Sequence, residues 1–149
     1  LRIEHGDLLR PAQYASARNK GLFIVQNPLH FALADLFNQR FSSSLLQDLE
    51  PMRTLLEQGI GLALGSDAVG DVGNPFLDIF FAVIQPSRPS EALTVEQAVI
   101  AYTRGSAAAE FQEAWKGTLA QEKLADLVVL SQGTSSPSRF RPSWAPKPC

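Results

Sequence analysis

The chain has 149 residues, enough for one ordinary domain with a hydrophobic core, and its 45% hydrophobic and 19% charged residues are typical of a globular protein. No apolar run reaches the length of a transmembrane helix, and the net charge of −2 gives no reason to expect nucleic acid or an anionic membrane as a partner. The single cysteine, Cys149, excludes an internal disulfide framework and a multi-cysteine zinc site.

The first thirty residues predict two strands separated by a helix. Residues 1–5 alternate in polarity and end in His5, which predicts a short strand. Pro11 suits the first turn of a helix, and Gly21 is a plausible residue to end it. Residues 22–26 form a continuous apolar run, as expected for a strand buried on both faces. This strand stops just before His30.

The next thirty residues predict mainly helix. Residues 31–37 are compatible with a short helix, and residues 42–44 with a serine-rich loop. Apolar residues then recur at helical spacing over residues 45–58, where Pro51 favours a start of the helix proper. Gly59 is expected to end this helix.

Residues 59–67 predict a strand that ends in a carboxylate. Large apolar residues alternate with Gly and Ala from Ile60 to Gly65, so one face of the strand is large and the other is nearly bare. By this alternation Asp67 falls on the bare side, which in an α/β barrel would point into the barrel at its catalytic end. The alternative is that Asp67 only terminates the strand in a turn. The glycines do not form a dinucleotide-binding motif, because they precede and lie within the strand instead of opening a helix.

The remainder predicts two helices, a small β element and a tail. Residues 75–84 form an apolar helix, and Thr94 with Gln97 gives a capping box for a helix that runs to about Ala109. Two strands are expected over residues 117–119 and 125–130. The Ser- and Pro-rich tail, residues 132–149, is expected to be disordered.

The alternation of strands and helices predicts an α/β fold with parallel, right-handed crossovers. Five segments in this order resemble the C-terminal part of a metal-dependent amidohydrolase, in the branch that contains N-substituted formamide deformylases and is similar to D-aminoacylases. The segments are residues 2–5, 26–30, 65–67, 93–109 and 117–130. The resemblance implies the last three strands of a (β/α)₈ TIM barrel over residues 1–112, followed by a fragment of a composite β-sandwich over residues 113–131.

The resemblance also implies roles for three residues. His5 matches a metal ligand, and Asp67 matches a residue that is both a metal ligand and the catalytic proton shuttle. His30 matches a substrate-binding position. The implied reaction is hydrolysis of a non-peptide carbon-nitrogen bond, of amide or formamide type, in a small-molecule substrate, with a divalent metal, zinc by preference, activating the water. Read without the resemblance, His5 is an ordinary strand-end histidine and His30 a polar loop residue.

Several family features have no counterpart in these residues. The His-x-His pair after strand one, the carboxylated lysine or equivalent carboxylate after strand four, and the histidine after strand five are not in this chain. Two protein ligands are fewer than the three of catalytic zinc sites, so the metal is expected only in a complete enzyme. The likeness ends at Ser131. A second reading is therefore a truncated, non-catalytic product with at most an interaction role.

Overall fold

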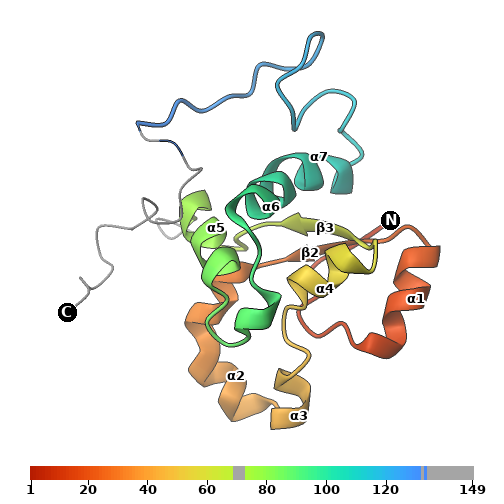
Figure 1. The fold of residues 1–149 in the computed structure, drawn as a ribbon, viewed down its shortest axis with the longest axis vertical. Helices are drawn as coiled ribbons and strands as arrows, with labels where there is room; N and C mark the ends of the chain where they lie inside the picture. Colours follow the sequence, from red (N-terminus) through yellow and green to blue (C-terminus); the bar gives the residue numbers. More distant parts are fainter. Residues whose placement is uncertain (69–72, 132, 134–149) are drawn as a thin grey trace.

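Three parallel strands run through the middle of the structure, a computed structural model that describes residues 1–68, 73–131 and 133 (Figure 1). The strands are β1 (Arg2–Ile3), β2 (Phe23–Gln26) and β3 (Gly61–Leu64), and their order in the sheet is β1-β2-β3. The register places Ile3 opposite Ile24, which in turn lies opposite Leu62. The sequence-based prediction of an α/β fold with a parallel sheet is thus confirmed.

Helices make all the connections between these strands. Between β1 and β2 runs α1 (Pro11–Asn19), and between β2 and β3 run η1 (Pro28–Leu33), α2 (Ala34–Arg40), α3 (Ser43–Leu46) and α4 (Met52–Glu57). After β3 follow α5 (Pro75–Ile84), η3 (Pro89–Glu91), α6 (Val95–Ile100), η4 (Ala101–Gly105) and α7 (Ser106–Ala109). The last three form one helical segment, in which η4 is a π-helical turn, and the capping box predicted at its start is present.

The core lies between β3 and the helices that pack on it. Both α4 and the segment from η4 to α7 contact β3. Gly105 allows the helical segment to lie directly against β3, because a Cβ at this position would overlap the carbonyl oxygen of Leu62. Ser106 then fixes the helix to the strand, since its hydroxyl donates a hydrogen bond of 2.9 Å to the carbonyl oxygen of Leu64. The fully buried apolar side chains of this core include Ile24, Met52, Leu55, Ala82 and Ala98.

One helix prediction and one loop prediction need correction. The helix expected over residues 45–58 is divided into α3 and α4, because Pro51 lacks the N–H that would continue it and Glu50 has a positive φ of 42°. The predicted serine loop is correspondingly shorter, since α3 already begins at Ser43. The helix predicted over residues 75–84 is confirmed with the same bounds.

The two C-terminal strands predicted over residues 117–119 and 125–130 are not formed in this structure. These residues belong to no strand, and Val128 and Val129 are 78% and 87% exposed. The physical reason is that a strand needs a hydrogen-bonding partner and a surface on which to bury its apolar side chains, and the described part of the chain offers neither here. The tail predicted to be disordered lies outside the described residues, apart from residue 133.

Within the described residues, no helix combines the length and hydropathy that a membrane crossing requires.

The contact between η4 and β3 generates a stability prediction. Gly105→Ala should destabilise the fold by about 1–3 kcal/mol, the usual cost of adding a methyl group to a packed site, because the backbone oxygen of Leu62 cannot move aside alone. Gly65→Ala is the matched control, since a Cβ there would meet its nearest atoms at 3.7 and 3.9 Å, which is ordinary contact. Urea denaturation of both variants measures the difference. Equal stability of the two variants would show that η4 does not press on β3.

Candidate functional site

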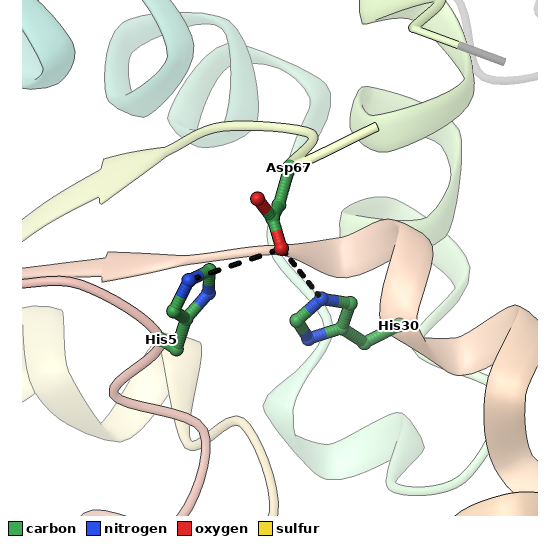
Figure 2. Close-up of side chains that lie close together, drawn as sticks. All are labelled: His5, His30 and Asp67. Atoms are coloured by element: carbon green, nitrogen blue, oxygen red, sulfur yellow. Dashed lines mark ion pairs between the residues drawn. The ribbon is translucent and has the colours of Figure 1, made fainter. Parts of the chain in front are cut away.

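The three strands deliver polar side chains to one edge of the sheet. His5 lies two residues after β1, His30 lies within η1 directly beyond β2, and Asp67 lies three residues after β3. Because the strands are parallel, their carboxyl ends share an edge, and the three side chains point toward one another there (Figure 2). The carboxyl edge of a parallel sheet is where α/β proteins place their ligands.

Asp67 stands between the two imidazoles. Its Oδ2 atom is 3.8 Å from Nε2 of His5 and 4.0 Å from Nε2 of His30 (Figure 2). The two imidazole rings are stacked with their centroids 5.9 Å apart. One ligand atom from each of the three residues can lie within 4.8 Å of the other two. Imidazole nitrogens and carboxylate oxygens are donors that suit zinc, so His5 and Asp67 alone already fit a divalent metal as two of its ligands.

Asn27 holds His5 in one orientation. The buried Asn27 side chain accepts a hydrogen bond of 2.9 Å at Oδ1 from Nδ1 of His5, and it donates one of 2.8 Å from Nδ2 to the carbonyl oxygen of Gly65. The Gly65 carbonyl can only accept, which assigns the oxygen of Asn27 to His5 and the proton of His5 to Nδ1. In the neutral tautomer that this hydrogen bond selects, the lone pair is on Nε2, which faces Asp67.

Asp7 holds His30 in a different way. Nδ1 of His30 donates a hydrogen bond of 2.8 Å to Oδ2 of Asp7. This hydrogen bond raises the pKa of His30, although partial burial acts to lower it. A carboxylate partner favours the imidazolium form of His30. The two histidines therefore differ in the group that accepts their Nδ1–H hydrogen bond, which is an amide oxygen for His5 and a carboxylate for His30.

Asp78 supports the turn that carries His30. This buried residue of α5 accepts hydrogen bonds from the backbone N–H of Leu29, at 3.2 Å, and from the hydroxyl of Tyr102, at 3.4 Å. Burial raises the pKa of Asp78 to about 6, although both hydrogen bonds lower it. The pKa of Tyr102 rises to about 12, because its hydroxyl is partly buried and faces this carboxylate. The link from α5 to η1 fixes the backbone next to His30.

Two of the three residues adopt a left-handed backbone conformation. The φ angles are 52° for His5 and 48° for Asp67. This conformation costs a residue with a side chain about 1–2 kcal/mol. β3 ends at Leu64, so Asp67 lies in the turn that follows the strand, and its side chain is exposed. Strained backbone of this kind concentrates at functional sites.

The structure brings together all three residues that the sequence singled out. His5 and Asp67, predicted as metal ligands, face each other, and His30, predicted as a substrate-binding residue, closes the cluster. Sequence reasoning missed their supports, which are Asn27, Asp7 and Asp78. The position of Asn27 and Asp7 directly after predicted strands was a usable signal, whereas Asp78 lies within an apolar helix and its partners are far away in sequence.

Several known proteins resemble this chain in sequence or in fold. The model of the amidohydrolase family matches residues 1–144. This match extends past Ser131, where the likeness was expected to end. An N-substituted formamide deformylase of Arthrobacter pascens is 29% identical over 140 residues, and YtcJ of Bacillus subtilis is 33% identical over 113 residues.

A protein of known crystal structure shares the fold of this chain over most of its length. An uncharacterized metal-dependent hydrolase of Pyrococcus furiosus is 26% identical and superposes with a TM-score of 0.81 over 91% of this chain. The chain spans 26% of the deformylase, 21% of YtcJ and 29% of the Pyrococcus protein, so it corresponds to about a quarter of each relative. From the family match over nearly its whole length, the chain belongs to the amidohydrolase family.

Proposed function

We propose that this chain contributes part of the active site of a metal-dependent hydrolase that acts on non-peptide carbon-nitrogen bonds of the amide or formamide type. The observation that carries the proposal is the convergence of His5, His30 and Asp67 at the carboxyl edge of the sheet (Figure 2). The likeness to a formamide deformylase supports the bond type, and the metal-dependent relative of known structure supports the metal.

The fold proposal follows the same relatives. The three parallel strands and their helices correspond to the last three strands of a (β/α)₈ barrel, here residues 1–112. The exposed apolar side chains at Leu127, Val128 and Val129 fit the interpretation of residues 113–131 as part of a β-sandwich, whose other strands would cover them. In the proposed whole protein, residues from elsewhere complete both the sheet and the metal site.

The proposed metal ligands are Nε2 of His5 and the carboxylate of Asp67. Both face the same point, and His5 has the proton on Nδ1, as ligation through Nε2 requires. A divalent metal, zinc by preference, would supply Lewis acidity there, which activates water and polarises a carbonyl group. Two protein ligands are fewer than the three of catalytic zinc sites, so zinc binding by this chain alone should be weak.

The proposed chemistry of the side chains follows from their charge. Asp67, 57% exposed, can accept a proton from the attacking water and deliver it to the leaving nitrogen. His30 donates from Nδ1 to Asp7, and in the imidazolium form, which this carboxylate favours, its Nε2–H can donate a hydrogen bond to the carbonyl oxygen of the substrate. This assignment gives each residue of the cluster a different task.

The assignment of ligands predicts how zinc affinity responds to substitution in the 149-residue chain. His5→Ala should weaken zinc binding by at least about tenfold, because it removes a ligand. His30→Ala should change it by less than about threefold, because His30 is assigned to hydrogen-bond the substrate and not to ligate the metal. Titration against a chromophoric zinc chelator measures both, and Asp35→Asn, at an exposed carboxylate of α2, is the control. Equal losses in the two histidine variants would make His30 a ligand.

Asn27 generates a second prediction about the same affinity. Asn27→Ala frees the His5 ring and should weaken zinc binding by about 10–100-fold, as is usual for groups that orient metal ligands. Asn27→Asp keeps an acceptor for Nδ1 and should retain more of the affinity. Asn38→Ala changes an exposed asparagine of α2 and serves as the matched control. Zinc affinity unaffected by Asn27→Ala would contradict the orienting role.

The proton-shuttle role is tested in a protein that contains the remainder of the barrel. Asp67→Asn should lower turnover of an amide or formamide substrate by about 10²–10⁴, because the amide keeps the size but cannot act as a base. His5→Ala should instead lose metal and turnover together. Metal content is measured beside turnover in both variants, with Asp35→Asn as the control. Near-native turnover of Asp67→Asn with full metal would reduce Asp67 to a turn residue, and an inactive whole protein would favour a non-catalytic interaction role.

A further inference from the structure

A second group of carboxylates lies behind His30, on the side away from Asp67. Four buried side-chain polar atoms have no hydrogen-bond partner among the residues that the structure describes. Three of them are Oδ1 of Asp7 and both carboxylate oxygens of Glu50, and the fourth is Oε1 of Gln26. Unpaired buried oxygens are rare because they lose their hydration without compensation. Their concentration in adjacent residues indicates a missing partner.

The backbone fixes Glu50 against Asp7. The N–H of Glu50 donates a hydrogen bond of 2.6 Å to the carbonyl oxygen of Asp7, and the side chain of Gln85 donates one of 3.3 Å to the carbonyl oxygen of Glu50. Glu50 has a φ of 42° and its side chain is fully buried. One ligand atom each from Asp7, His30 and Glu50 can lie within 4.8 Å of the other two. The Glu50 carboxylate is therefore held beside Asp7 and His30, and neither of its oxygens has a hydrogen-bond partner in the part of the chain that the structure describes.

Electrostatics makes this arrangement costly without a cation. Burial, together with the negative charges of Asp7 and Asp78, raises the pKa of Glu50 well above its ordinary value. Protonation would remove the charge of Glu50, but one proton cannot satisfy three oxygens. A divalent cation would neutralise both carboxylates and contact all three oxygens at once. Its oxygen ligands lie at about 2.0–2.6 Å, so ligand atoms of one ion are up to about 5 Å apart, which matches this cluster.

The size and chemistry of the site restrict the class of ion. The three oxygens are already closed off from solvent by this chain's own residues, which excludes an organic cation. Hard carboxylate oxygens favour Mg²⁺, Mn²⁺ or Ca²⁺ over ions that prefer sulfur. The second oxygen of Asp7, Oδ2, remains bonded to Nδ1 of His30. The cation and His30 thus use different oxygens of the same carboxylate.

We propose that Asp7 and Glu50 form a second, buried site for an oxygen-preferring divalent cation, distinct from the proposed metal site at His5 and Asp67. Through the carboxylate of Asp7 the ion would hold His30 in position from behind. This inference goes beyond the proposed function and does not depend on it, because the cation binds to residues that take no part in the chemistry assigned to Asp67.

The test uses Mn²⁺ as the probe and the 149-residue chain stripped with a chelator. The double variant His5→Ala with Asp67→Asn removes the ligands of the other site, so binding that remains reports on Asp7 and Glu50. Electron paramagnetic resonance should show one equivalent of bound Mn²⁺ in this background. Adding Glu50→Gln should weaken that binding at least tenfold, whereas adding Glu57→Gln, at an exposed carboxylate of α4, should leave it unchanged.

Two outcomes would overturn the proposal. One is the failure of the double variant to bind Mn²⁺ while circular dichroism shows it folded. The other is unchanged Mn²⁺ affinity after Glu50→Gln. That result would show that Glu50 is a neutral, protonated acid and not a ligand, because the glutamine amide would then substitute for it without loss. Should Glu50→Gln fail to fold, Asp7→Asn at the partly exposed partner decides the question, with a tenfold loss of affinity expected and an unchanged affinity contradicting the site.

Discussion

The parallel pairing of β1, β2 and β3 is the constraint on which the rest of the structure depends. Parallel strands end at the same edge, so the residues after each strand meet there although they are far apart in sequence. Asn27 makes this geometry explicit, because its amide is bonded both to His5 after β1 and to the carbonyl of Gly65 after β3. A shift in the register of either strand pair would separate the groups that form the site.

The two histidines of the site differ because their supporting partners differ. A neutral amide at Nδ1 leaves His5 with a lone pair on Nε2, which suits a metal ligand. A carboxylate at Nδ1 raises the pKa of His30 and favours a ring that donates from both nitrogens. Asp67 stands about 4 Å from both rings and can interact with each. The different roles proposed for His5 and His30 thus follow from the residues that accept their Nδ1–H hydrogen bonds and not from the imidazole rings themselves.

Sequence patterns predicted the parts of this structure that depend on local periodicity and on chain order. The buried run at β2, the glycine-alternating strand β3 and the helix that begins at Pro75 all follow from spacing and from turn residues, and they are found where predicted. His5 and Asp67 were predicted because they follow strands, but the resemblance to amidohydrolases was needed to assign them roles. The resemblance itself is confirmed by the family match.

The remaining features depend on contacts between distant residues and have no local signal. Nothing near Glu50 in the sequence indicates that its carboxylate is buried against Asp7, and nothing near Asp78 indicates its bonds to Leu29 and Tyr102. The left-handed backbone conformation of Asp67 likewise has no signal in the neighbouring residues. The C-terminal strands were predicted from β-forming residues. A strand also requires a neighbouring strand with which to pair, and residues 117–130 pair with no strand of the described part of the chain.

The central claim is that His5 and Asp67 share a metal ion while His30 does not. The most direct measurement is an anomalous difference map at the zinc edge from zinc-soaked crystals of a protein that contains the remainder of the barrel. The account predicts a peak within coordination distance of Nε2 of His5 and the carboxylate of Asp67, with His30 still bonded to Asp7. A peak coordinated by His30, or no peak at the carboxyl edge of the sheet at saturating zinc, would contradict it.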